Sequence, residues 1–409
     1  YVAQGEVTIG TDDNPQRVTV TGDVHLILTD GCTLTVNGGI QVEKGNSLTI
    51  YGQSEQTGTM GRLIASITEE DASIYHAVIG GNGSDTGGNE GGAVTIHGGF
   101  VSATATVIDF SQSDPDTSQG NNNGSFAGDS YGAAIGGGGS ETGTGGDGGT
   151  ITIFGGTVRA ESVLGAGIGG GSGGSGGGDG GKVTISGGAV RAESYYGGGI
   201  GGGCDLSGGD TGGDGGTITI SGGTVEVQSV SGAAIGGGTS GLGFSGEGPL
   251  TRGVGGSGGT ITISGGSVTA TTMTGRTIGQ LSEMGAGRWA GAAIGGSFGG
   301  SSGNITISGG TVTAIVSSQT APYAEPDSHP QYSAGIGSSD HNSIGGGTIT
   351  ISGGTVFAQS PDGAGIGSGE NSDGSDIVIA ISGGTVEAVS TNGAGIGGGM
   401  IEALSAMVN

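Results

Sequence analysis

Apolar and polar residues alternate along most of the chain, and the alternation returns in one recurring phrase. The phrase reads TITIFGGTVRA from residue 150, KVTISGGAVRA from 182, TITISGGTVEV from 217 and TITISGGTVFA from 348. On each side of the Gly-Gly pair, Ile, Val or Ala occupies every second position, which is the period of a β-strand with one buried face. The phrase therefore predicts two short strands joined by a tight bend, where glycine supplies the backbone conformation.

A second phrase of glycine, alanine and one isoleucine recurs alongside the first. Its isoleucines are Ile79, Ile135, Ile168, Ile200, Ile235, Ile294, Ile336, Ile366 and Ile396. The shortest spacing, from Ile336 to Ile366, is 30 residues, which suits three strands per turn of a solenoid. The repeat predicts an all-β fold: a single right-handed parallel β-helix, with coils about 4.8 Å apart and ladders of Ile, Val and Ala inside.

The repeat divides the chain by regularity rather than into separate domains. Residues 1–92 alternate in the same way with few glycine phrases, and we expect them to form N-terminal coils with a less regular repeat. Residues 93–400 are the glycine-rich regular coils, and residues 401–409 are a C-terminal tail. The expected organisation is one β-helix domain over residues 1–409.

Composition narrows the classes of function. The chain has 108 glycines but 7 prolines, and 36 acidic against 9 basic residues give a net charge of −27. This charge would repel nucleic acids and anionic membranes, so neutral polymers or cations fit better as partners. The apolar runs are too short for a membrane span. Cys32 and Cys204 form no metal-binding spacing, and we expect two free, mostly buried thiols.

The phrases ITISGGTV and GAGIGGG, which follow the alternating opening segment, also carry a family resemblance. The chain resembles glycine-rich β-helical surface proteins of Gram-positive gut bacteria, a group associated with carbohydrate binding, and more loosely the β-helical lacto-N-biosidase-type glycoside hydrolases. The resemblance implies an extracellular or cell-surface bacterial protein with an oligosaccharide or polysaccharide partner and no organic cofactor. Since the chain begins at Tyr1 rather than Met, we expect any targeting segment to have been removed.

Three long insertions interrupt the repeat after the second strand, at residues 104–131, 271–291 and 315–333. Insertions in a solenoid map onto one face, so we expect them to rise from one corner and to flank a floor about 14 Å wide made by the plain coils. The sequence thus predicts a sugar-binding cleft. Its first wall holds Asp109 and Asp116, to which the lacto-N-biosidase resemblance draws attention as catalytic candidates, although Asx turns also explain an Asp-rich loop.

Outward positions on the plain coils give the second set of catalytic candidates. Aligning the strands on their valines puts Arg159, Arg191 and Glu226 in one column and Glu161, Glu193 and Gln228 in the next. Glu161 and Glu193, one coil apart, have the spacing that retaining glycosidases need between nucleophile and acid/base. Their mutual repulsion would separate their pKa values. The alternative is that Arg159–Glu161 and Arg191–Glu193 are simple surface ion pairs.

Aromatic and polar side chains around the predicted cleft are the candidate sugar-binding groups. Exposed aromatic rings stack on sugars, and neighbouring polar groups hydrogen-bond to them. The candidates are Arg159, Arg191, Glu226 and Gln228 on the floor, Tyr195 and Tyr196 beside them, and Arg276, Arg288 and Trp289 on the second wall. An equal alternative for Trp289 is that its ring packs the long loop that carries it against the β-helix.

One acidic residue per coil forms a further column. Asp147, Asp179 and Asp214 each lie three residues before a first strand, in the turns GGDGGT, GGDGGK and GGDGGT. Since one Asp occurs in each of three consecutive coils, we expect these carboxylates to stack. Structural Ca²⁺ is a candidate bridge between them, and solvated turn aspartates are the alternative.

The predicted cleft, its carboxylates and its aromatic residues rank three classes of function. We expect an extracellular glycoside hydrolase that cleaves an oligosaccharide with paired carboxylates, and the alternative is a non-catalytic polysaccharide-binding or adhesin module. A structural stalk or an ice-binding protein ranks third. Thr pairs such as Thr150 and Thr152 form an outward array that resembles ice-binding β-helices, but Lys182, Asn304 and Ile377 interrupt it.

Overall fold

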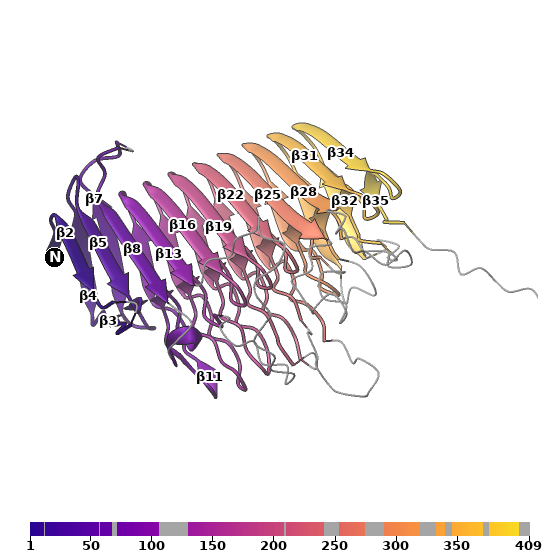
Figure 1. Cartoon of the computed structure of the whole chain (residues 1–409). Helices are drawn as coiled ribbons and strands as arrows, with labels where there is room; N and C mark the ends of the chain where they lie inside the picture. Colours follow the sequence, from indigo (N-terminus) through magenta and orange to yellow (C-terminus); the bar gives the residue numbers. More distant parts are fainter. Residues whose placement is uncertain are drawn as a thin grey trace, which may run out of the picture.

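Three parallel sheets, each of 11 strands, run along one common axis (Figure 1). The computed structural model describes residues 1–11, 13–56, 58–67, 72–105, 130–207, 210–240, 253–274, 290–318, 333–339, 346–370 and 376–400. Each coil contributes one strand to each sheet, and successive coils pair in parallel. The chain is therefore a right-handed parallel β-helix with three strands per coil, and the fold class predicted from the repeat is confirmed.

The strands are short and follow the two recurring phrases. The first sheet comprises β1 (Val2–Ala3), β4 (Asp23–Leu28), β7 (Ser47–Gly52), β12 (Ala93–Ile96), β15 (Thr150–Ile153), β18 (Lys182–Ile185), β21 (Thr217–Ile220), β24 (Thr260–Ile263), β27 (Gly303–Ile307), β30 (Gly347–Ile351) and β33 (Ile377–Ile381). The second sheet comprises β2 (Glu6–Ile9), β5 (Thr33–Asn37), β8 (Arg62–Ile67), β13 (Phe100–Ala105), β16 (Thr157–Ser162), β19 (Ala189–Ser194), β22 (Thr224–Ser229), β25 (Ser267–Thr274), β28 (Thr311–Ser318), β31 (Thr355–Ser360) and β34 (Thr385–Ser390).

The third sheet is made by the isoleucine-glycine phrase, with two residues per strand. It comprises β3 (Val18–Thr19), β6 (Ile40–Gln41), β9 (Ile79–Gly80), β14 (Ile135–Gly136), β17 (Ile168–Gly169), β20 (Ile200–Gly201), β23 (Ile235–Gly236), β26 (Ile294–Gly295), β29 (Ile336–Gly337), β32 (Ile366–Gly367) and β35 (Ile396–Gly397). A small hairpin of β10 (Gly83–Ser84) and β11 (Gly87–Gly88) and a 3₁₀ turn, η1 (Ala72–Tyr75), complete the described elements. No described helix has the length and apolar character needed to cross a membrane.

The interior enclosed by the three sheets, here called the three-sheet core, holds the inward residues of every strand. In the coil of β15, β16 and β17 these are Ile151, Ile153, Val158, Ala160 and Ile168, all 0 % exposed. Each lies in register with an Ile, Val or Ala of the next coil. Because three short strands enclose a narrow space, side chains of this size fill it at normal packing density and larger ones would not fit.

The Gly-Gly bend between the first and second strands depends on the second glycine. Gly156 has φ +83°, a left-handed backbone conformation that residues with a Cβ rarely adopt. A Cβ at this position would also lie 2.5 Å from the carbonyl oxygen of Gly99 in the preceding coil. The bend therefore requires glycine for both conformation and space.

The segments that lead from the third strand to the next first strand stack on one another and form a second ordered region, here called the glycine layer. It comprises the described parts of 137–149, 170–181, 202–216 and 237–259. A continuous series of backbone hydrogen bonds crosses it: Gly171 N–H donates to Gly146 O, Gly178 to Gly171, Gly203 to Gly178, Gly213 to Gly203 and Gly238 to Gly213, at 2.8–2.9 Å. The backbones approach so closely that a Cβ on Gly213 would lie 1.9 Å from the Gly178 carbonyl oxygen.

A smaller apolar cluster fills the corner between the second and third sheets, beside the glycine layer. Its buried members are Tyr131, Val163, Leu164, Tyr195, Tyr196, Cys204 and Val230. The other cysteine, Cys32, belongs to the three-sheet core. Both thiols are free and buried, as the sequence predicts.

Candidate functional site

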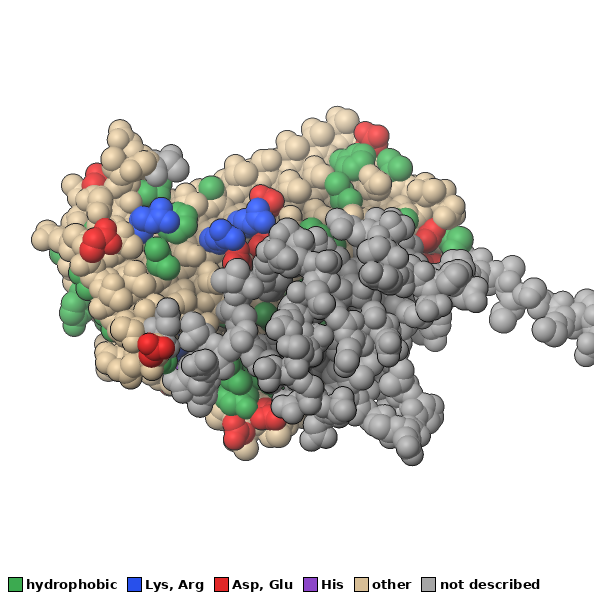
Figure 2. Space-filling view, viewed as in Figure 1, with side chains coloured by type: hydrophobic (Ala, Val, Ile, Leu, Met, Phe, Trp, Pro, Cys, Tyr) green, Lys and Arg blue, Asp and Glu red, His purple; other side chains and the backbone are tan. Residues whose placement is uncertain are grey.

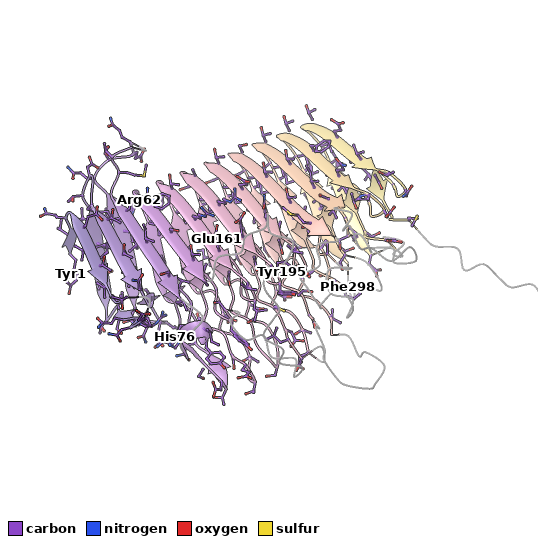
Figure 3. All side chains as sticks on the ribbon, viewed as in Figure 1. Tyr1, Arg62, His76, Glu161, Tyr195 and Phe298 are labelled. Atoms are coloured by element: carbon purple, nitrogen blue, oxygen red, sulfur yellow. The ribbon has the colours of Figure 1, made fainter. Side chains whose placement is uncertain are left out.

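The two predicted columns of charged residues lie on the outer face of the second sheet. Arg159 pairs with Arg191, and Arg191 with Glu226, across β16, β19 and β22. In the adjacent column Glu161 pairs with Glu193, and Glu193 with Gln228. The alignment on the valines is thus confirmed. Figure 2 shows basic and acidic side chains gathered on this side of the solenoid, and Figure 3 labels Glu161 there.

Ion pairs link the two columns along each strand. Arg159 Nε pairs with Glu161 Oε1, and Arg191 Nη2 lies 2.5 Å from Glu193 Oε1. A longer contact of 3.4 Å joins Arg191 Nη1 to Glu226 Oε1, which also accepts a 3.5 Å hydrogen bond from Gln228. The ion pairs expected under the alternative interpretation are therefore present, and they form one network over three coils.

The two glutamates are buried, which corrects the expectation that they are exposed surface residues. Glu161 is 5 % exposed and Glu193 is 2 % exposed, whereas the Arg159 and Arg191 side chains are 53 % and 43 % exposed. Strand alternation shows which side chains leave the three-sheet core, but it does not show what packs on them outside. A change at either glutamate therefore alters a buried group rather than a solvated one.

Burial and crowding act on the protonation of this pair. Burial raises the pKa of Glu193, against the hydrogen bond and charge of Arg191, and the neighbouring Glu161 carboxyl raises the Glu193 pKa further. Among the described residues, Arg191 Nε is buried without a hydrogen-bond partner. A buried carboxyl with a raised pKa, stacked on a second carboxyl, is an arrangement that general acid–base chemistry uses.

The two predicted stacking tyrosines do not line this face. Tyr195 and Tyr196 are 3 % and 2 % exposed and belong to the corner cluster, where their ring centroids lie 4.6 Å apart. Figure 3 shows Tyr195 beyond the end of the strands, away from Glu161. The prediction that these tyrosines form a sugar platform is wrong. The turn after Ser194 directs both rings into the corner cluster, where they are buried beside the glycine layer.

The candidates on the long insertions lie outside the described residues. These are Asp109 and Asp116 on the first wall and Arg276, Arg288 and Trp289 on the second. The cleft that depends on these walls stays a prediction.

The predicted Asp column is present in the glycine layer and has a structural role. Asp179 N–H donates to Asp147 Oδ1 at 3.0 Å, Asp214 N–H to Asp179 Oδ1 at 2.9 Å, and Ser257 N–H to Asp214 Oδ1 at 2.7 Å. Burial raises the pKa of Asp147 and of Asp179. Each carboxylate therefore caps the backbone of the next coil.

A cavity of about 370 Å³ adjoins this column and is lined in part by Asp179, Asp214, Thr211, Ser257 and Ser301. In the part of the chain that the structure covers, no group of three or more His, Cys, Asp or Glu side chains is placed to hold a metal ion. Binding of Ca²⁺ by Asp147, Asp179 and Asp214 stays a prediction.

The predicted Thr array is also present, with one change of register. Thr152 of β15 pairs with Thr184, and Thr184 with Thr219, on the outer face of the first sheet. In β33 the residue opposite Thr348 is Val378, 63 % exposed, rather than Ile377. The interruption of the array therefore falls one residue later than the sequence alignment predicts.

Sequence analysis missed a ladder of stacked rings beside the Thr array. His25 and Tyr51 have centroids 5.8 Å apart, Tyr51 and His97 4.9 Å, and His97 and Phe154 4.8 Å, with interplanar angles of 4–12°. The rings of Tyr51, His97 and Phe154 follow the inward isoleucine of successive first strands. The signal was present in the repeat, since this position is Ser in the later copies of the phrase and aromatic only in the early ones.

Comparison with known proteins agrees with the architecture. The family model described as "Beta helix repeat" matches residues 151–172, 183–204, 218–239, 305–340, 349–370 and 379–400. The first three matched segments each run from a first strand past the isoleucine-glycine strand of the same coil. No curated protein and no solved structure matches the chain. The matched repeats and the three parallel sheets together make this chain a parallel β-helix protein.

Proposed function

We propose that the chain is an extracellular, carbohydrate-active β-helix that hydrolyses a glycosidic bond with Glu161 and Glu193. The observation that carries the proposal is the buried, in-register stack of these two carboxyls, one of which has a raised pKa. A raised pKa favours the protonated form from which a general acid donates, and a second carboxyl beside it can act as the nucleophile.

The two glutamates differ in ways that suggest their roles. Glu193, with the raised pKa, would protonate the glycosidic oxygen as the sugar bond breaks. Glu161, ion-paired to Arg159, would attack the anomeric carbon, and water would then release the sugar with Glu193 acting as base. Arg159 and Arg191 are about half exposed and mark the side from which a sugar would reach the pair.

A non-catalytic sugar-binding module is the second candidate, and one observation favours it. Both glutamates already have an arginine partner two residues away, so each of these two carboxyls has a counter-charge without a substrate. Under this function the exposed arginine edges would hydrogen-bond to sugar hydroxyls, and no bond would break.

Product release separates the two candidates. The protein is incubated with a panel of neutral host and plant oligosaccharides, and released sugars are separated by chromatography. We expect turnover, and we expect Glu161→Gln and Glu193→Gln each to lower it at least about a hundredfold, the scale of general acid–base catalysis. Glu226→Gln is the matched control, because Glu226 belongs to the same network but its side chain is 46 % exposed.

Two results would overturn the assignment. Binding of a glycan without any released sugar favours the second candidate. Turnover that survives both glutamine variants but is abolished by Asp109→Asn or Asp116→Asn assigns the chemistry to the first insertion. Circular dichroism of each variant shows whether the fold is retained.

A further inference from the structure

The ladder of rings on the first sheet ends on an aromatic face that no side chain of the next coil covers. His97 stacks on one side of Phe154 at 4.8 Å. On the other side the next coil places Ser186, whose N–H donates to Ile153 O at 2.9 Å and whose position therefore continues the column. A serine side chain is too short to cover a phenyl ring, and Phe154 is 50 % exposed.

We propose that this open face of Phe154 binds a sugar ring of a neutral glycan. The ladder has a repeat of 4.8–4.9 Å between its closest rings, so the place above Ser186 has the thickness of one further ring. A pyranose has an apolar face of C–H groups that packs on an aromatic ring, and Phe154 presents such a ring at the end of an ordered stack.

The surroundings of Phe154 match the polar rim of a sugar. Beyond Ser186 the column continues with Ser221 and Ser264, one in each of the next two coils, and both serines are exposed. The adjacent column presents the hydroxyls of Thr184 and Thr219. Hydroxyl groups both donate and accept hydrogen bonds, so they can pair with sugar hydroxyls in either sense.

Other flat ligands fit this surface less well. A nucleic-acid base would bring phosphates towards a chain with a net charge of −27, which opposes binding. A second copy of this chain would bring the same negative charge, so self-association through Phe154 is opposed in the same way. A neutral glycan meets neither penalty.

This site is separate from the proposed catalytic pair. Phe154 belongs to the end of β15 in the first sheet, whereas Glu161 and Glu193 lie on the outer face of the second sheet. Its test therefore uses the Glu193→Gln background, in which binding is measured without hydrolysis. If Phe154 does not bind glycans, the proposed catalytic role of the two glutamates is unaffected, and the converse also holds.

Affinity electrophoresis tests the proposal with four soluble neutral probes: mixed-linkage β-glucan, xylan, galactomannan and laminarin, each cast in a native gel. We expect at least one probe to retard the protein and Phe154→Ala to weaken its binding about tenfold or more. Phe154→Trp retains a large ring and should retain binding. Ser186→Phe would extend the ladder by one ring and present the same kind of open face above Ser221, so it should retain binding while circular dichroism stays unchanged.

Three outcomes would overturn the proposal. The first is that none of the four probes retards the protein. The second is equal retardation of the parent protein and Phe154→Ala. The third is a dimer in sedimentation experiments that Phe154→Ala dissociates, which would assign the face to contact between two copies.

Discussion

The three-sheet core and the glycine layer order the same coils by opposite means. In the three-sheet core, side chains such as Ile151, Val183 and Ile218 stack in register and are 0 % exposed. In the glycine layer, backbone packs directly on backbone, and a Cβ on Gly203 would lie 2.0 Å from the Gly171 carbonyl oxygen. The first region is stabilised by apolar burial and the second by close hydrogen-bonded backbone.

The contrast explains a composition that ordinarily indicates disorder. Glycine loses more conformational freedom on folding than any other residue, so 108 glycines are costly to order. The glycine layer offsets this cost because each of its segments hydrogen-bonds to the coils before and after it. A stacked repeat supplies those neighbours for every internal segment, which an isolated glycine loop lacks.

The largest expected effect comes from adding one carbon to the glycine layer. In Gly213→Ala the new Cβ would lie 1.9 Å from Gly178 O, so the stacked backbones must move apart. We expect a loss of roughly 3 kcal/mol of unfolding free energy, at the upper end of overpacking effects, measured by chemical denaturation. The matched control is Gly87→Ala, where nothing lies within 4 Å of the added carbon. It should leave stability unchanged or raise it by up to about 1 kcal/mol, and equal losses in both variants would contradict the close packing of the layer.

Removing one carbon from the three-sheet core should cost less. Ile218→Val leaves a small void, but Val183 already occupies the equivalent position in the preceding coil. The expected loss is about 1 kcal/mol, typical of Ile-to-Val changes, in the same denaturation experiment. If Ile218→Val proves more damaging than Gly213→Ala, side-chain packing rather than backbone packing limits the stability of these coils.

The smallest expected effect is a dependence of stability on pH. Burial raises the pKa of Asp147, Asp179 and Glu193 above the ordinary values of 3.8 for Asp and 4.5 for Glu. Between those values and the raised ones the folded chain binds more protons than the unfolded chain, so stability is highest below that range and falls as pH rises through it. The Ser47 hydrogen bond lowers the pKa of Asp23, which opposes this only below pH 3.8.

Thermal melting between pH 4 and pH 7 measures this dependence. We expect Tm to fall with rising pH, and we expect Asp179→Asn to reduce the slope. The asparagine keeps an Oδ1 acceptor for the Asp214 N–H but has no charge to bury. A Tm that rises over this range would contradict the burial of these carboxyls.

The sequence predicted the fold nearly completely because the repeat encodes it locally. Alternation of TITI with glycine bends specifies which face of each strand is buried, and recurrence of the same two phrases in successive coils fixes the register between coils. The prediction that glycine forms the bend between the two strands is confirmed at Gly156, which has a positive φ. The glycine layer was not foreseen, because close approach of backbones from different coils has no signature in the side-chain pattern.

The candidate site was predicted in its alignment but not in its environment. The in-register columns of Arg159 and Glu161 follow from strand period alone. Contacts outside the three-sheet core bury Glu161 and Glu193. Such contacts also place Tyr195 and Tyr196 in the corner cluster. Such contacts join residues of different coils, and one repeat read by itself does not contain them.

The hydrogen bonds of the Asp column all run in one direction along the solenoid. In each of its hydrogen bonds the accepting carboxylate belongs to the earlier coil and the donating N–H to the later one, as in Asp179 to Asp147. Because synthesis proceeds from the N-terminus, each acceptor carboxylate of this column is made before the N–H that binds it. In the coils that carry Asp147, Asp179 and Asp214, each turn therefore presents to the following turn an acceptor for its backbone N–H.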